Sequence, residues 1–225
     1  MTLRELYDLS GYLSGIGSLI IAACSIISFR SRPAYIKVLG LYAVTSIIFS
    51  LAQKLSEWFF GNVGLNAIGN TWTLFEALLL SLLFYNITKS TTFRKGIFVS
   101  AALYTVFYLI TFLSFADHSY SLIRFGRDFL VIFYSLAYFY YLIRELPEED
   151  LLKTPMFWIN SAVIFFFSGT LILSFMRDYI VNVLKDDLTG FWAFRNFFRF
   201  GFCLLLAYAG CLNWRSIKSK EAEIT

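Results

Sequence analysis

Seven apolar stretches, each about 20 residues or longer, take up most of this chain of 225 residues. An α-helix needs about 20 residues to cross the roughly 30 Å of hydrocarbon in a bilayer. Strands of a membrane barrel would be about ten residues long and alternating in polarity, so these stretches predict helices. They run over Ser10–Phe29, Ile36–Phe60, Asn66–Ile87, Gly96–Phe115, Tyr120–Ile143, Pro155–Met176 and Gly190–Trp214. The predicted fold is all-α: a polytopic membrane protein in which residues 1–225 form one seven-transmembrane-helix bundle without a soluble domain.

The composition excludes several other classes of protein. Hydrophobic residues make up 58% of the chain and charged residues 15%, whereas a soluble domain is about half apolar and a quarter charged. Basic residues form no continuous stripe, so nucleic acid is not an expected partner. Cys24, Cys203 and Cys211 lack the spacing of a metal or redox motif. Because no set of nucleophile, base and metal is assembled either, we expect no cofactor, no metal and no enzyme activity.

Basic residues in the loops and at the very ends of the stretches are divided unequally between the two sides of the predicted bundle. The N-terminal side holds three, Arg4, Arg177 and Lys185, and the opposite side holds eleven. Loops rich in Lys and Arg remain in the cytoplasm. We therefore expect an integral protein of the bacterial inner membrane with its N-terminus outside and its C-terminus in the cytoplasm. The eleven are Arg30, Arg32, Lys37, Lys89, Arg94, Lys95, Arg144, Lys153, Arg215, Lys218 and Lys220.

Tyr and Trp residues are expected at the two membrane interfaces, where one end of each ring is wet and the other is not. The predicted outer group is Trp58, Trp72, Tyr120 and Trp192, and the predicted inner group is Tyr42, Tyr85, Tyr141, Trp158 and Trp214.

Eight ionisable side chains lie inside the predicted spans, where each is a candidate for function because a charge in hydrocarbon is unfavourable. With a helical rise of about 1.5 Å per residue, all eight fall in the outer half or near the midplane. The spacings i,i+3 and i,i+4 place each set on one helix face. Five bases and three acids leave a surplus of two positive charges. The eight are Lys54, Glu57, Glu76, Arg124, Arg127, Asp128, Arg195 and Arg199.

This pattern predicts a cationic polar cavity, open to the outside, that binds a small anionic or zwitterionic ligand. Arginine suits recognition of carboxylate or phosphate because its planar guanidinium can donate two parallel hydrogen bonds. The expected ligand-binding residues are the eight charged side chains together with Asn70 and Asn196. Internal pairing is the alternative: Arg124 or Arg127 with Asp128, Lys54 with Glu57, and Glu76, near the midplane, with Arg195 or Arg199.

Two short patches are similar to patches in small seven-helix membrane proteins of bacteria whose function is unassigned. The first is Asn70-x-Trp72-x-x-x-Glu76 in the third stretch, and the second is Phe157-Trp158-Ile159 leading to Ser168-Gly169 in the sixth. The resemblance implies a seven-helix layout for most of the chain. It implies no catalytic residues.

The predicted function is that of a receptor or sensor, and a transporter and a structural subunit are the alternatives. A seven-helix receptor or sensor would bind the ligand outside and signal through a separate cytoplasmic protein. A transporter would use Glu76 and the arginines as a midplane site for a small solute or proton. A structural or accessory subunit would use the charges only for pairing. Besides the lipid bilayer, a homodimer is a further partner, since Gly11-x-x-x-Gly15 allows close helix approach inside the bundle or between copies.

The orientation predicts the outcome of reporter fusions at Thr225. A reporter that is active only in the cytoplasm should be active there, because the eleven-to-three distribution of basic residues places the C-terminus inside. Activity of a periplasmic reporter at the same position would contradict the orientation.

Overall fold

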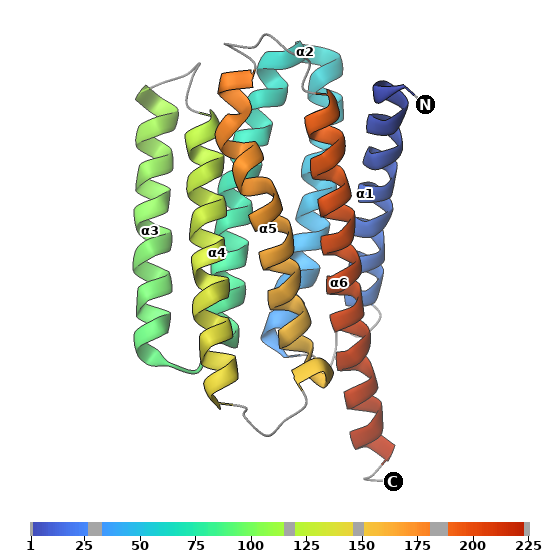
Figure 1. The fold of residues 1–225 in the computed structure, drawn as a ribbon, viewed down its shortest axis with the longest axis vertical. Coiled ribbons are helices and arrows are strands. Elements are labelled where there is room, and N and C mark those ends of the chain that lie inside the picture. Colours follow the sequence, from blue (N-terminus) through green and yellow to red (C-terminus); the bar gives the residue numbers. More distant parts are fainter. Residues whose placement is uncertain (1, 27–32, 115–119, 146–150, 181–188, 223–225) are drawn as a thin grey trace.

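The computed structural model describes residues 2–26, 33–114, 120–145, 151–180 and 189–222, and these residues are almost entirely helical. The helices are α1 (Leu3–Ile26), α2 (Ala34–Ile87), α3 (Thr91–Ser114), α4 (Tyr120–Glu145), α5 (Pro155–Tyr179) and α6 (Thr189–Ala222). A short 3-10 helix, η2 (Leu151–Lys153), precedes α5. The helices stand side by side along the long axis (Figure 1).

The second and third predicted spans are joined in one helical element, α2, so the helix break expected at Gly61–Gly64 is wrong. The chain nevertheless reverses direction within α2, and its two halves run side by side (Figure 1). The rings of Phe49 and Trp72 are 5.2 Å apart, and the Tyr42 hydroxyl donates to the Glu76 carboxylate over 2.7 Å. In these two contacts the residue number increases along one half of α2 as it decreases along the other. This is the pattern of two antiparallel helices. The two halves of α2 therefore pack as an antiparallel pair.

Five segments of the described chain are long and apolar enough to cross a membrane. They are Leu3–Cys24, Ala34–Ser56, Ala67–Ile87, Thr91–Leu113 and Pro155–Arg177. The remaining two long helices, α4 and α6, carry charged residues within their length. The N- and C-termini lie at opposite ends of the bundle (Figure 1). This is the architecture of a polytopic α-helical membrane protein.

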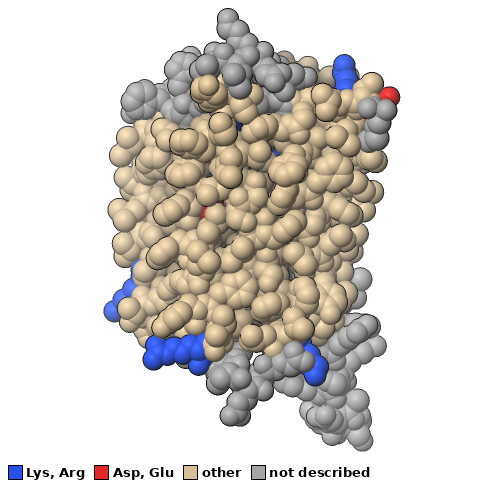
Figure 2. Space-filling view, viewed as in Figure 1, with Lys and Arg blue, Asp and Glu red and all other residues tan. Residues whose placement is uncertain are grey.

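The surface in view supports the membrane assignment. Figure 2 shows a broad zone across the middle of the molecule in which only small spots of charged side chains are visible between the others. Most of the basic residues in view lie at the end away from the N-terminus. Lys37, Lys89, Lys95 and Arg144 are exposed at the helix ends on that side. An apolar band that faces lipid, with charged residues at its edge, is typical of proteins that span a bilayer.

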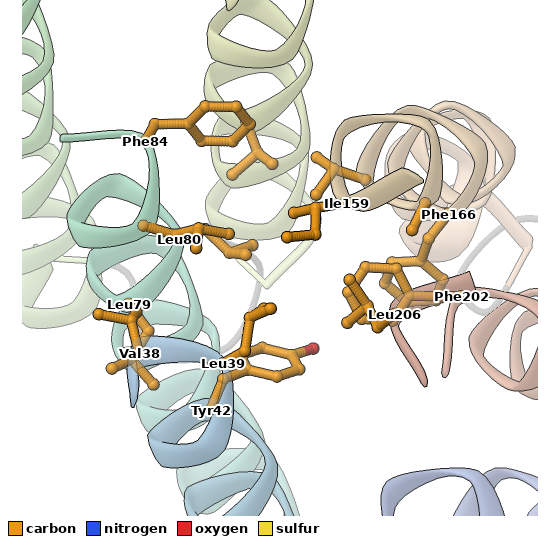
Figure 3. Close-up of a cluster of buried hydrophobic side chains, with 14 of the residues drawn as sticks. Val38, Leu39, Tyr42, Leu79, Leu80, Phe84, Ile159, Phe166, Phe202 and Leu206 are labelled. Atoms are coloured by element: carbon orange, nitrogen blue, oxygen red, sulfur yellow. The ribbon is translucent and has the colours of Figure 1, made fainter. Parts of the chain in front are cut away.

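The core fills the bundle axis with apolar side chains from four directions. Side chains from both halves of α2, from α5 and from α6 converge in Figure 3. Leu80, Phe84, Phe166 and Phe202 are each 1% exposed or less. Interiors packed this way leave little room for water or solute, so the axis is closed at this level.

Small and polar residues bring neighbouring helices together. A Cβ at Gly17 of α1 would lie 2.7 Å from Cβ of Cys203 of α6, so only glycine permits this approach. The glycine-rich face of α1 thus packs inside the bundle at Gly17. On the other side, Ser135 of α4 donates to the Asn160 side-chain oxygen of α5, and the Asn160 amide donates to the Ser135 carbonyl. Such pairs hold helices in lipid, where unpaired polar groups are unfavourable.

Candidate functional site

A buried arginine, Arg127 of α4, lies at the centre of a charged network. Its Nη1 donates to Glu76 of α2 over 2.5 Å, and its Nε and Nη2 donate to Oδ1 of Asp128 over 2.8 and 2.5 Å. None of the three side chains is more than about 2% exposed. A single guanidinium therefore binds one acid on its own helix and one on α2.

Two hydroxyl groups extend this network to other helices. Ser174 of α5 donates to Oδ2 of Asp128 over 2.5 Å. Tyr42, in the first half of α2, donates to Oε1 of Glu76 over 2.7 Å. Both carboxylates thus receive an arginine on one oxygen and a hydroxyl on the other. The polar chain runs from α5 through α4 to both halves of α2.

A small pocket lies directly beside the network, between α4, α5 and α6. Its enclosed volume is about 20 Å³, enough for one or two water molecules, and it opens at the surface. It contains no carboxylate among the described residues that line it. Ser174 belongs to both structures, because its side chain lines the pocket and also bonds Asp128. The lining residues are Arg124, Leu173, Ser174, Arg177, Phe191, Trp192 and Arg195.

Trp192 positions two of the pocket arginines. The guanidinium carbons of Arg124 and Arg195 lie 5.4 and 5.5 Å from the centre of its indole ring, within the range of cation–π attraction. Gly69 of α2 makes room for Arg124, since a Cβ there would be 3.3 Å from Nη2 of the arginine. Within the described part of the chain, neither Arg124 nor Arg195 has an ion pair or a hydrogen bond. Two cations beside the network therefore lack a counterion among the described residues.

The expected partner of Glu76 is wrong, because Glu76 pairs with Arg127 and not with Arg195 or Arg199. Arg199 donates instead to the Ser46 hydroxyl. Sequence spacing gave Glu76 a depth but not a direction, and Arg127 lies at nearly the same depth on the neighbouring α4. The alternative pairing of Arg127 with Asp128 is confirmed.

The other predicted site residues are dispersed. Lys54 is exposed, because its long side chain carries the ammonium away from the core. The side chain of Glu57 lies outside the described residues. Asn196 faces α1, where its amide donates to Ser10 over 3.2 Å. Asn70 is buried, and its side chain has no hydrogen-bond partner among the described residues, but it does not line the pocket.

Several residues in and around the site escaped the sequence reasoning, among them Ser174, which joins the pocket to the network. Arg177 was expected in an outer loop, but it lies in the last turn of α5 and lines the pocket. Its i,i+3 spacing from Ser174 is the signal that could have found it. Tyr42 and Trp72 were expected at the interfaces, yet they are 4% and 6% exposed and pack on each other. Trp192 was placed near the outer boundary but not in a site.

No protein-family model, curated protein or solved structure matches this chain. The residues themselves therefore carry the functional interpretation.

Substitution of the two kinds of arginine should have different consequences for stability. Arg127→Leu leaves two buried carboxylates without their cation, and we expect it to lower the free energy of unfolding by about 3–5 kcal/mol. Arg195→Leu removes a cation that has no acid partner, so we expect a loss of about 1 kcal/mol or less. Reversible unfolding in mixed micelles measures both. Equal losses would contradict the assignment of Arg127 as the structural arginine.

Proposed function

We propose that this protein is a membrane receptor or sensor for a small anion, which binds in the arginine-lined pocket between α4, α5 and α6. The observation that carries this proposal is the double role of Ser174. Its side chain lines the pocket, and its hydroxyl bonds the Asp128 carboxylate of the buried network. Whatever occupies the pocket therefore lies next to the charges that join three helices.

The pocket has the chemistry of an anion site. Arg124 and Arg195 are held against one indole and lack counterions among the described residues. A positive charge removed from water without a partner is unfavourable, so a bound anion would be stabilised there. The absence of any carboxylate among the described lining residues favours an anion over a zwitterion, whose ammonium group would need an acceptor.

The network offers a route from the pocket toward the opposite end of the bundle. From Ser174 it passes through Asp128, Arg127 and Glu76 to Tyr42. Tyr42 lies eight residues, or about 12 Å of helix, from the start of α2 at Ala34. A ligand that shifts Ser174 would change the hydrogen bonds of every helix in this series, which is how a ligand biases one arrangement of a bundle over another.

The packing below the pocket supports a receptor more than a transporter. Leu80, Phe84, Phe166 and Phe202 fill the axis (Figure 3). Passage of an anion would require these side chains to separate, whereas a signal requires only that the network shift. A receptor of this design, with its N-terminal end outside, would act on a separate cytoplasmic protein through the basic end of the bundle.

Hydrogen exchange tests the coupling. We expect that a small anion that raises the thermal stability of the purified protein will also change amide exchange over residues 34–42. Tyr42→Phe removes only the hydroxyl that bonds Glu76, so this variant should still bind the anion but lose the exchange change. Tyr104→Phe is the matched control, because that hydroxyl is buried and bonds the Ile123 carbonyl outside the network.

Three results would count against the receptor. If no small anion raises the thermal stability of the protein, the proposed ligand class is wrong. If the ligand still changes amide exchange over residues 34–42 in Tyr42→Phe, the hydrogen-bond network does not transmit the signal. Uptake of the bound anion into proteoliposomes would favour the transporter.

A further inference from the structure

We infer that the pocket binds a phosphate monoester group, which carries two negative charges. This inference rests on the proposed anion site and adds the chemical class of the ligand. It follows from the charge of the pocket, from the arrangement of its guanidinium groups and from the apolar part of its lining.

Charge balance favours a dianion. Of the three arginines that line the pocket, Arg124 and Arg195 have no ion pair or hydrogen bond among the described residues, which leaves two positive charges there. The acids Glu76 and Asp128 are already bonded to Arg127. A monoanion such as a carboxylate or a phosphodiester would leave one pocket cation unbalanced. A phosphate monoester balances both, because its second pKa is about 6 and it is dianionic at slightly alkaline pH.

The placement of the two guanidinium groups suits tetrahedral oxygens. Arg124 on α4 and Arg195 on α6 approach the indole of Trp192 from two different helices. Each guanidinium can donate a parallel pair of hydrogen bonds. A phosphate monoester has three terminal oxygens that point in different directions, so two arginines can each donate to it. A carboxylate has two oxygens in one plane and suits a single guanidinium.

The rest of the lining is apolar and would contact the organic part of such a ligand. Leu173, Phe191 and Trp192 provide apolar surface beside the arginines. The pocket is also close to the end of the bundle, since Trp192 is three residues from the start of α6 and Arg177 is two residues from the end of α5. In a bundle that spans a bilayer, lipid phosphates lie near the helix ends. The phosphate group can therefore come from a soluble monoester or from a lipid headgroup.

Four probes test separately whether the charge of the phosphate group or its origin, soluble or lipid, determines binding. They are titrated against the full-length protein in detergent at pH 8. Methyl phosphate and dimethyl phosphate are soluble and differ by one charge. Dihexanoyl phosphatidate and dihexanoyl phosphatidylglycerol are lipids that differ in the same way. We expect each monoester to bind at least about tenfold more tightly than its diester, because one charge-assisted contact is worth about 1.5–3 kcal/mol. A lipid source predicts that phosphatidate binds more tightly than methyl phosphate, and a soluble source predicts the reverse.

Variants locate the binding. Arg124→Gln and Arg195→Gln should each weaken binding of the monoester by about 10- to 100-fold. Lys54→Gln is the matched control, because Lys54 is an exposed cation on α2 outside the pocket, and it should leave the affinity unchanged. General stabilisation by phosphate as a salt would persist in the Gln variants.

The outcomes distinguish this inference from the proposed function. If a diester or acetate binds as tightly as the monoester, and Arg195→Gln weakens all of them, the anion site stands and the phosphate class is overturned. If the Gln variants bind the monoester as well as the unsubstituted protein does, the inference is overturned at this pocket. If no anion binds, the proposed function fails with it.

Discussion

The contact between Arg127 and its two acids is the interaction on which the rest of the structure depends. Arg127 is completely buried, as is Asp128, and Glu76 is 1% exposed. A lone charge at such a position in a membrane would be strongly unfavourable, so the three groups are stable only together. Their bonds require α4 and the second half of α2 to keep one relative position. Ser174 and Tyr42 then extend the same requirement to α5 and to the first half of α2.

The arginines of this bundle divide into two kinds, and the division explains why the charge pattern resists a purely structural interpretation. Arg127 pairs with Glu76 and Asp128, the two buried acids of the described residues. Arg124 and Arg195 are left with the face of Trp192, and cation–π attraction is weaker than a buried ion pair. A bundle that needed charges only for cohesion would gain little from the second kind. Their position next to Ser174 gives them a direct connection to the first kind, and this supports the proposed sensing of an anion.

Sequence reasoning predicted the all-α bundle because apolar stretches of helix length carry a strong and local signal. It also placed Glu76, Arg127 and Asp128 in one layer, since depth follows from residue count. It did not predict which way each side chain points around its helix. The partner of Glu76, the exposure of Lys54 and the contact of Asn196 with α1 depend on the rotation of each helix about its axis, which tertiary packing sets. Tyr42 was misplaced because its aromatic character is equally suited to an interface and to a buried hydrogen bond. The chain reverses direction within α2 although the predicted helix break is absent.

The division of the arginines is tested most directly by locating a heavy-atom analogue of phosphate in crystals of the protein. Arsenate has the charge and tetrahedral oxygens of phosphate, and arsenic gives an anomalous signal. The account predicts an anomalous peak between the guanidinium groups of Arg124 and Arg195, with Arg127 still bonded to Glu76 and Asp128. A peak at Arg127 with its acids displaced, or a peak only among the basic residues at the opposite end of the bundle, would contradict it.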